Sequence, residues 1–435
     1  MKKNKVMTDS LIIGFALFAM FFGAGNLIFP PYLGFGSASN WFWGFMAYII
    51  TDIGLSIFAL LMIAKKGHGS TGITEVIGDK WSTILLVVNT ICLGPLIAIP
   101  RTGATTFEFA VQPIFPPYIN SWVCGIVFFT LVILFSLKQS KIIDIIGTIL
   151  TPIMLVTLAL LIIKGIMSPL GTPNYNENVK GVLSAGIKAG YQTMDMMGVT
   201  ILSVTLMSSI KQKGYSGKKE QSKMIALSGL VASIGLFAVY CGLAYLGATV
   251  STVYPTHLKQ AELLIAITKG LMGQSGVILL GIIVAAACLT TAIGLVASSA
   301  QYFSEVSHGK LKYEYLVIAI SAFSCVVSNA GISNIIAFAA PILDVIYPIL
   351  LVLTFMALFS NFIKNNNIYK GAALGALITS VLTVQTRFTG FTLGMDMLPL
   401  AEMGFNWLIP AIIGGVIGNF IKPKKVNAEL VNQEL

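Results

Sequence analysis

The sequence predicts an all-α polytopic membrane protein with about twelve transmembrane helices. Hydrophobic residues make up 56% of the 435 positions and charged residues only 10%, whereas an ordinary soluble domain carries about 25% charged residues. Many windows of about 18 or more residues are apolar enough to cross a bilayer as a helix. The first apolar stretch has no small-residue cleavage site and further spans follow it, so we interpret it as a retained helix and not as a signal peptide.

The expected spans follow one another along nearly the whole chain. They are 9–35, 41–64, 82–111, 120–137, 142–166, 181–208, 223–248, 275–303, 313–330, 334–362, 369–387 and 404–421. Of the 27 basic residues, 20 fall in the segments that this order places on the side of the N-terminus. Because cytoplasmic segments carry an excess of Lys and Arg, we expect both termini in the cytoplasm and the chain in a bacterial-type inner membrane. The net charge of +10 therefore orients the chain and does not require a nucleic-acid partner.

Residue types that carry enzyme chemistry are scattered along the chain. No cluster of His, Asp or Glu stands at one membrane face, so we expect no enzyme, and no phosphate-cradling glycine loop indicates ATP-driven transport. The cysteines lie in apolar spans without metal-like spacing and are interpreted as buried thiols: Cys92, Cys124, Cys241, Cys288 and Cys325. We expect no cofactor and no obligate protein partner, with membrane lipid as the surroundings.

The first span is interrupted at Gly23–Asn26, near the expected middle of the bilayer. Apolar residues run unbroken from Leu11, Gly-Ala-Gly-Asn follows, and Pro30–Pro31 comes one turn later. Lipid cannot satisfy the backbone groups that such a break frees, so they line a cavity or bind something. Secondary transporters build binding sites at the midplane in this way. The alternative is a kink or a glycine for close helix packing, and this stretch alone leaves both open.

The sixth span carries a second interruption in a position that corresponds to the first. Its polar run, Gly190-Tyr-Gln-Thr-Met-Asp195, lies 165 residues after Gly25, which is room for five spans. An inverted repeat would place broken helices at this separation, so the pair favours a transporter. Asp195 is an expensive charge at membrane depth, typical of either a functional site or a structural ion pair.

Further polar residues lie inside spans. Arg101 and Glu108 are seven residues apart, or two helical turns, so we expect them on one face of the third span as a structural or gating pair. Asp52 and Asp344 are other acids within spans. In the eighth span two adjacent hydroxyls, Thr290 and Thr291, could supply oxygen ligands to a hard cation such as sodium. The alternative is that each threonine bonds back to a carbonyl of its own helix.

These residues resemble those of a known family. The run Phe-Phe-Gly-Ala-Gly-Asn-Leu-Ile-Phe-Pro-Pro at 21–31, the run Ala-Gly-Tyr-Gln-Thr-Met-Asp at 189–195 and the chain length are similar to the BrnQ family of branched-chain amino-acid carriers, which are LIVCS-type cation symporters. The resemblance implies import of leucine, isoleucine and valine together with a cation. It also implies a LeuT-type fold with broken helices 1 and 6, made of two five-helix inverted repeats and two further helices. The implied parts are 1–166 for the first repeat, 181–330 continuing to 362 for the second, 369–421 for the additional helices and 422–435 for a cytoplasmic tail.

A more distant resemblance to LeuT-type sodium symporters implies an ion site. Their first helix has a Gly-x-Gly-Asn break and their eighth an Ala-x-x-Thr-Ser pattern, to which Gly23–Asn26 and Ala287–Thr291 are similar. By this resemblance, sodium would bind the carbonyl oxygens of Ala19, Phe22 and Ala287. The hydroxyls of Thr290 and Thr291 would complete the site. The sixth span departs from the pattern at Asp195, which leaves proton coupling open.

The expected substrate site combines the two breaks. Free amides at the start of the second half-helix would face the substrate carboxylate, while freed carbonyls and Asp195 would face its ammonium group. Methionines would let several aliphatic side chains share one pocket. The predicted substrate residues are Phe21, Gly23, Ala24, Gly25, Asn26, Gly190, Gln192, Thr193, Met194, Asp195, Met197 and Leu295. We expect Na⁺ symport by alternating access; an H⁺ symporter that uses Asp195, a membrane-embedded enzyme and a channel are the alternatives.

Overall fold

The computed structural model describes residues 2–66, 72–115, 119–137, 151–390 and 394–421. Within these segments the regular structure is helical and contains no β-strand. Six helix runs in the described part are long and apolar enough to cross a membrane, and four shorter apolar helices accompany them. The all-α membrane class predicted from composition is confirmed. The start of the fifth expected span, 142–150, and the expected tail, 422–435, lie outside the described residues.

The helices of the first half follow the expected spans, three of which are interrupted. They are α1 Lys2–Phe21, α2 Ala24–Ser37, α3 Trp41–Ile49, α4 Leu55–Lys66, α5 Asp79–Ile91, α6 Ala98–Thr106, α7 Ser121–Ser136 and α9 Thr151–Met167. A π turn at Ile50–Gly54 joins α3 to α4, and another at Cys92–Leu96 joins α5 to α6. Such turns are frequent at functional sites because the wider turn redirects the side chains after it.

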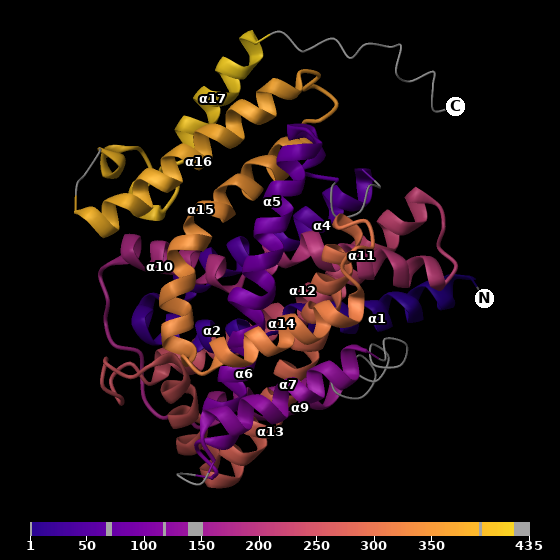
Figure 1. The fold of residues 1–435 in the computed structure, drawn as a ribbon. Coiled ribbons are helices and arrows are strands. Elements are labelled where there is room, and N and C mark those ends of the chain that lie inside the picture. The colour runs from indigo at the N-terminus through magenta and orange to yellow at the C-terminus, as the bar shows by residue number, and fades with distance from the viewer. Residues whose placement is uncertain (1, 67–71, 116–118, 138–150, 391–393, 422–435) are drawn as a thin grey trace.

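The second half also begins with a broken helix, which is followed by longer helices. Its helices are α10 Val179–Thr193, α11 Asp195–Gln212, α12 Lys218–Thr249, α13 Gln260–Val306, α14 Tyr313–Ser328, α15 Ile332–Leu358, α16 Asn366–Thr389 and α17 Leu408–Phe420. Gly273, at φ 67°, divides α13 into a short first part and a long second part. The last two helices, α16 and α17, pack side by side at the edge of the bundle (Figure 1).

Glycines let α2 approach α12 at backbone distance. A Cβ added to Gly34 would lie 1.8 Å from the carbonyl oxygen of Ala244, and one added to Gly247 would lie 1.8 Å from that of Pro31. Only glycine permits this approach, and small residues at such contacts are typical of membrane helices. By contrast, a Cβ on Gly23 would meet Thr291 at 3.5 Å, an ordinary contact. Close helix packing therefore explains Gly34 and does not explain the break at Gly23.

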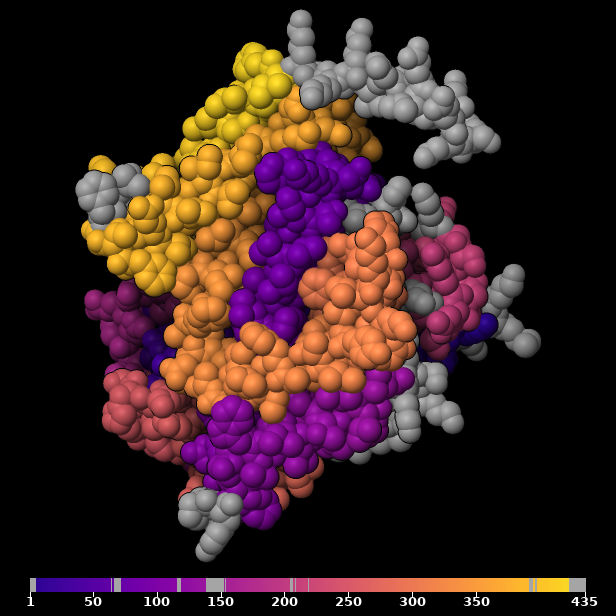
Figure 2. Space-filling model, viewed as in Figure 1, coloured from indigo at the N-terminus to yellow at the C-terminus, as the bar shows by residue number. Residues whose placement is uncertain are grey.

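The outer surface is apolar where helices face outward. α5 exposes Trp81, Ile84, Val88 and Ile91, which are three or four residues apart and so share one helical face. Figure 2 shows this helix, in purple, reaching the surface between orange segments of the C-terminal half. An exposed apolar face of this extent suits contact with lipid chains.

Candidate functional site

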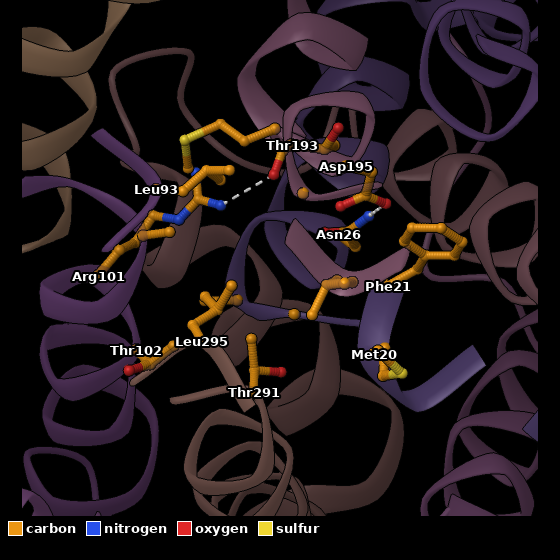
Figure 3. Close-up of a pocket in the computed structure, with 16 residues that line it drawn as sticks. Met20, Phe21, Asn26, Leu93, Arg101, Thr102, Thr193, Asp195, Thr291 and Leu295 are labelled. Carbon is orange, nitrogen blue, oxygen red and sulfur yellow. Dashed lines mark hydrogen bonds between the residues drawn. The ribbon is translucent and has the colours of Figure 1, made fainter. Parts of the chain in front are cut away.

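A pocket lies where the two broken helices meet (Figure 3). Its walls come from the end of α1, the start of α2, α6, the α10–α11 break and α13. The empty space is about 430 Å³, counting the part that is open to its surroundings. The expectation that both interruptions contribute to one cavity agrees with this geometry.

The first break exposes the amide end of α2 to the pocket. α1 ends at Phe21, Gly23 has extended backbone (φ −105°, ψ −171°), and α2 starts at Ala24 without a side-chain cap. The first amides of a helix have no partner within it, so those of α2 are free to bind a ligand. Asn26 is buried beside them, and its Nδ2 donates to Oδ2 of Asp195 at 2.7 Å. This bond joins the first break directly to the second.

The second break is held by contacts to other helices. Met194 adopts the left-handed conformation (φ 69°) between α10 and α11. The hydroxyl of Thr193, just before it, lies within hydrogen-bonding distance of two acceptors, Oδ1 of Asp52 at 2.8 Å and the carbonyl of Gly190 at 2.6 Å. Asp52 comes from the π turn that joins α3 to α4. A residue of the second span therefore fixes the geometry of the sixth.

Arg101 of α6 lies in the pocket and closes the end of α10. Its Nη1 donates to the carbonyl of Gln192 at 2.8 Å. Its Nη2 donates to the carbonyl of Thr193 at 3.3 Å (Figure 3). The expected pair with Glu108 is wrong. Glu108 instead accepts from the amide of Ile332 at 2.8 Å and caps the start of α15. Seven residues place two side chains on one face but about 10 Å apart along the axis, and each finds a nearer backbone partner.

Two carboxyl groups from different spans face each other beside the pocket. Asp52 lies near both Asp195 and the hydroxyl of Tyr48, but its Oδ2 has no hydrogen-bond partner among the described residues. Asp195 lines the pocket, whereas Asp52 is fully buried behind it. Two buried carboxylates near each other repel unless a proton or another cation lies with them. Asp344, by contrast, pairs with Arg387 between α15 and α16, away from the pocket.

Most of the predicted substrate residues line the pocket. Eight of the twelve do so: Phe21, Gly23, Ala24, Asn26, Thr193, Met194, Asp195 and Leu295. Gly25 lies just behind the wall, against Arg101. Gly190 and Gln192 contribute carbonyls to Thr193 and Arg101, and the carbonyl of Met197 accepts from Asn89.

The sequence prediction missed part of the lining. The additional residues are Met20, Leu93, Ala98, Arg101, Thr102, Gly198 and Leu202. The apolar residues among them have no distinguishing pattern within an apolar span. Arg101 did have one, because a lone arginine at membrane depth is itself a reason to expect a site.

Of the predicted ion ligands on α13, Thr291 lies next to the first break. The hydroxyl of Thr290 donates to the carbonyl of Ala287 at 2.8 Å, as in ordinary back-bonding. Thr291 differs: its buried hydroxyl has no hydrogen-bond partner among the described residues, and it faces Gly23. An unpaired buried oxygen beside a helix break fits a cation ligand. Ala19, in the last turn of α1, and Phe22, directly after that helix, are both buried.

Nearly the whole chain, including the residues of this pocket, is similar in sequence to a family of known proteins. A family model described as branched-chain amino acid transport protein matches residues 6–425. The chain belongs to this family. The branched-chain amino acid permease BraB of Bacillus subtilis (strain 168) is 35% identical over 441 residues, which cover 98% of this chain and 99% of that relative.

Two solved structures have a similar fold. One is a Na⁺-coupled sialic acid symporter in a substrate-bound outward-open state, with a TM-score of 0.61, 13% identity and coverage of 95% of this chain and 90% of that one. The other is MHP1, a nucleobase-cation-symport-1 family transporter in a closed conformation with bromovinylhydantoin bound, with a TM-score of 0.58, 13% identity and coverage of 97% and 96%.

Membership of the branched-chain amino acid transport family confirms several expectations. The chain is a multi-pass membrane protein that transports amino acids, and since its relatives are permeases and carriers, it is not an enzyme. The similarity to both solved structures confirms the LeuT-type fold. The division into repeats at 1–166, 181–362 and 369–421 stays a prediction.

Proposed function

We propose that this family member imports leucine, isoleucine and valine by symport with Na⁺ through alternating access. The observation that carries the proposal is a pocket at two helix breaks with a cationic side, Arg101, and an anionic side, Asp195. A free amino acid is a zwitterion, so opposite charges in one small pocket match both of its ends. In this arrangement the pocket as a whole stays close to neutral when the substrate binds.

The walls between the two charges match an aliphatic side chain. Met20, Leu93, Met194, Leu202 and Leu295 all line the pocket. Two of them are methionines, whose flexible side chains adapt to branched groups of different shape. This supports one pocket for all three branched-chain amino acids. Transport would follow from rocking of the bundle formed by spans one, two, six and seven against the other helices.

Sodium is the proposed coupling ion because of the oxygen atoms around the first break. Thr291 supplies an unpaired buried hydroxyl at this position, and Thr290 and the carbonyls of Ala19, Phe22 and Ala287 would complete the ligand set. An ion held there would fix α1 and α13 together and so favour the state that accepts substrate. We place the protein in a bacterial inner membrane with both termini in the cytoplasm, without an organic cofactor or an obligate protein partner.

A proton is the second candidate ion, and the carboxyl pair supports it. The hydroxyl of Thr193 has one proton but lies within bonding distance of two acceptors, Asp52 and the carbonyl of Gly190. Both contacts are satisfied if Asp52 carries a proton and donates it to Thr193. A carboxyl pair with Asp195 that holds one proton would also relieve the repulsion between the two acids.

The test is uptake of radiolabelled leucine into proteoliposomes under an imposed Na⁺ gradient, an imposed proton gradient, both or neither. Sodium symport predicts stimulation by the Na⁺ gradient alone. In a Thr290→Ala, Thr291→Ala double variant that stimulation should collapse while the protein still inserts. Thr354→Ala is the matched control, since this buried threonine donates to the carbonyl of Leu350 in its own helix, α15. Unchanged sodium stimulation in the double variant would show that the ion lies elsewhere.

The proton alternative has its own variant. Asp52→Asn keeps a hydrogen-bonding group beside Thr193 but cannot release a proton at any pH used. If protons drive transport, this variant should lose uptake driven by the proton gradient and keep exchange of internal for external leucine. Leucine uptake that ignores both gradients in the wild type would remove symport altogether.

A further inference from the structure

Arg101 is a buried cation that forms no ion pair with a carboxylate among the described residues. Its side chain is 95% buried (relative exposure 5%), and among the described residues the ion pairs are Lys213 with Asp9 and Arg387 with Asp344. Neutral carbonyls at the end of α10 accept two of its hydrogen bonds. A carbonyl lowers the cost of burying the charge but does not balance it. A charge in this position calls for an anion that arrives with the ligand.

The guanidinium keeps donors free for such an anion. It has five N–H groups, and its two bonds to the carbonyls of Gln192 and Thr193 use two of them. Its Nε is buried and has no hydrogen-bond partner among the described residues. Three donors in a fixed planar fork can hold a carboxylate through two bonds at once.

The start of α2 faces the same guanidinium. A Cβ added to Gly25 would lie 2.7 Å from Nη2 of Arg101, so the guanidinium occupies the space that any other residue would fill at this position. Gly25 belongs to the first turn of α2, whose amides have no capping side chain. The ring of Phe29 lies 5.8 Å from Cζ of Arg101 and covers one face of the cation. Free amides and free guanidinium donors thus converge at one wall of the pocket.

We propose that Arg101 binds the α-carboxylate of the substrate together with the free amides at the start of α2. Arg101 then makes the transporter require a free carboxylate and reject amines and amides of the same shape. This inference rests on the proposed function, since it names the group that orients an amino acid in the pocket. Because Arg101 also holds the end of α10, a bound carboxylate would tie α6 to both broken helices.

The experiment measures competition against radiolabelled leucine binding to the purified transporter, with leucine, leucinamide and 3-methylbutylamine as competitors. In the wild type, leucinamide and the amine should bind about 100-fold more weakly than leucine, because they lack the carboxylate. In Arg101→Gln, leucine affinity should fall by about 100-fold, while leucinamide affinity changes little. The preference for leucine over leucinamide should therefore disappear. Arg387→Gln is the matched control, since this arginine lies half exposed on α16, and its preference should equal that of the wild type.

A purely structural role for Arg101 predicts a different pattern. Loss of its bonds to the end of α10 would then lower the affinities for leucine and leucinamide by the same factor. The preference for leucine over leucinamide would remain, and this result would overturn the proposal. Unchanged leucine affinity in Arg101→Gln, or a wild type that binds leucinamide as well as leucine, would also overturn it and leave the proposed transport intact. A wild type that binds none of the branched-chain amino acids would overturn the proposed function and this inference with it. If Arg101→Gln does not fold, Arg101→Lys decides: it keeps the charge but loses the fork, so the preference should narrow by about tenfold.

Discussion

The two broken helices reach similar geometry by different means. At the first break, glycines supply the unusual backbone: Gly23 is extended, and Gly25 makes room for a neighbouring side chain. The second break has no glycine at its turning point. Met194 is left-handed there, a conformation that costs an ordinary residue about 1–2 kcal/mol. It is maintained because surrounding helices hold the residues on either side.

Each of those holding contacts comes from the first half of the chain. Asp52 accepts from Thr193, Arg101 donates to the carbonyls of Gln192 and Thr193, and Asn26 donates to Asp195. The first break is therefore encoded locally, while the second depends on tertiary partners. A half-helix held by side chains from other spans can be released when those partners change, which is what a rocking mechanism requires.

Among the variants at the two breaks, Asp195→Ala should have the largest effect. The change removes the bond to Asn26, leaves the side-chain amide of Asn26 unpaired and takes away the acid that lines the same pocket as Arg101. We expect leucine uptake to fall by about 100-fold or more, since loss of one member of a buried charged network costs several kcal/mol. Uptake into proteoliposomes at matched protein density measures it. Asp344→Ala is the control, because this acid lies outside the pocket with a half-exposed partner. If Asp195→Ala transports within a few-fold of the wild type, the two breaks are not functionally joined.

The difference between the breaks also explains what the sequence could predict. The residues Gly23–Asn26 are visible as an interruption because glycine and asparagine stand out in an apolar span. The polar run at 190–195 located the second break to within a few residues. Neither stretch indicated that Asn26 and Asp195 would bond to each other, since that contact spans 169 positions and depends on how the helices pack.

Side-chain direction after a break was harder to predict. The left-handed turn at Met194 rotates the start of α11, so Gly198 and Leu202 line the pocket while Met197 does not. Arg101 was assigned to its nearest acid along the sequence. In a folded membrane protein the freed carbonyls of another broken helix were better partners, and regular helical spacing cannot reveal them.

A second test compares two glycines of the first break. Gly25→Ala would push a methyl group to 2.7 Å from Nη2 of Arg101, whereas Gly23→Ala would make an ordinary 3.5 Å contact with Thr291. We expect leucine affinity to fall by about tenfold in Gly25→Ala, because displacing the guanidinium weakens but does not abolish its interaction with the substrate carboxylate. Gly23→Ala should change affinity by less than about threefold. Binding of radiolabelled leucine to both variants measures the difference, and equal affinities would mean that Gly25 has no special role beside Arg101.

The smallest expected effect tests the backbone at the second break. At position 194, alanine removes the buried side chain but keeps the left-handed strain, whereas glycine removes the side chain and relieves the strain. Met194→Gly should therefore be more stable than Met194→Ala by about 1 kcal/mol, the reverse of their order inside a regular helix. At position 23 the backbone is extended with negative φ, so alanine should be tolerated as well as glycine. The apparent Tm in detergent is measured for Met194→Gly, Met194→Ala, Gly23→Ala and the wild type, which has glycine at position 23. The Tm difference between the alanine and glycine forms is then compared at the two positions. If alanine at 194 matches or exceeds glycine, then the left-handed turn at Met194 stores no strain, and the second break is as locally encoded as the first.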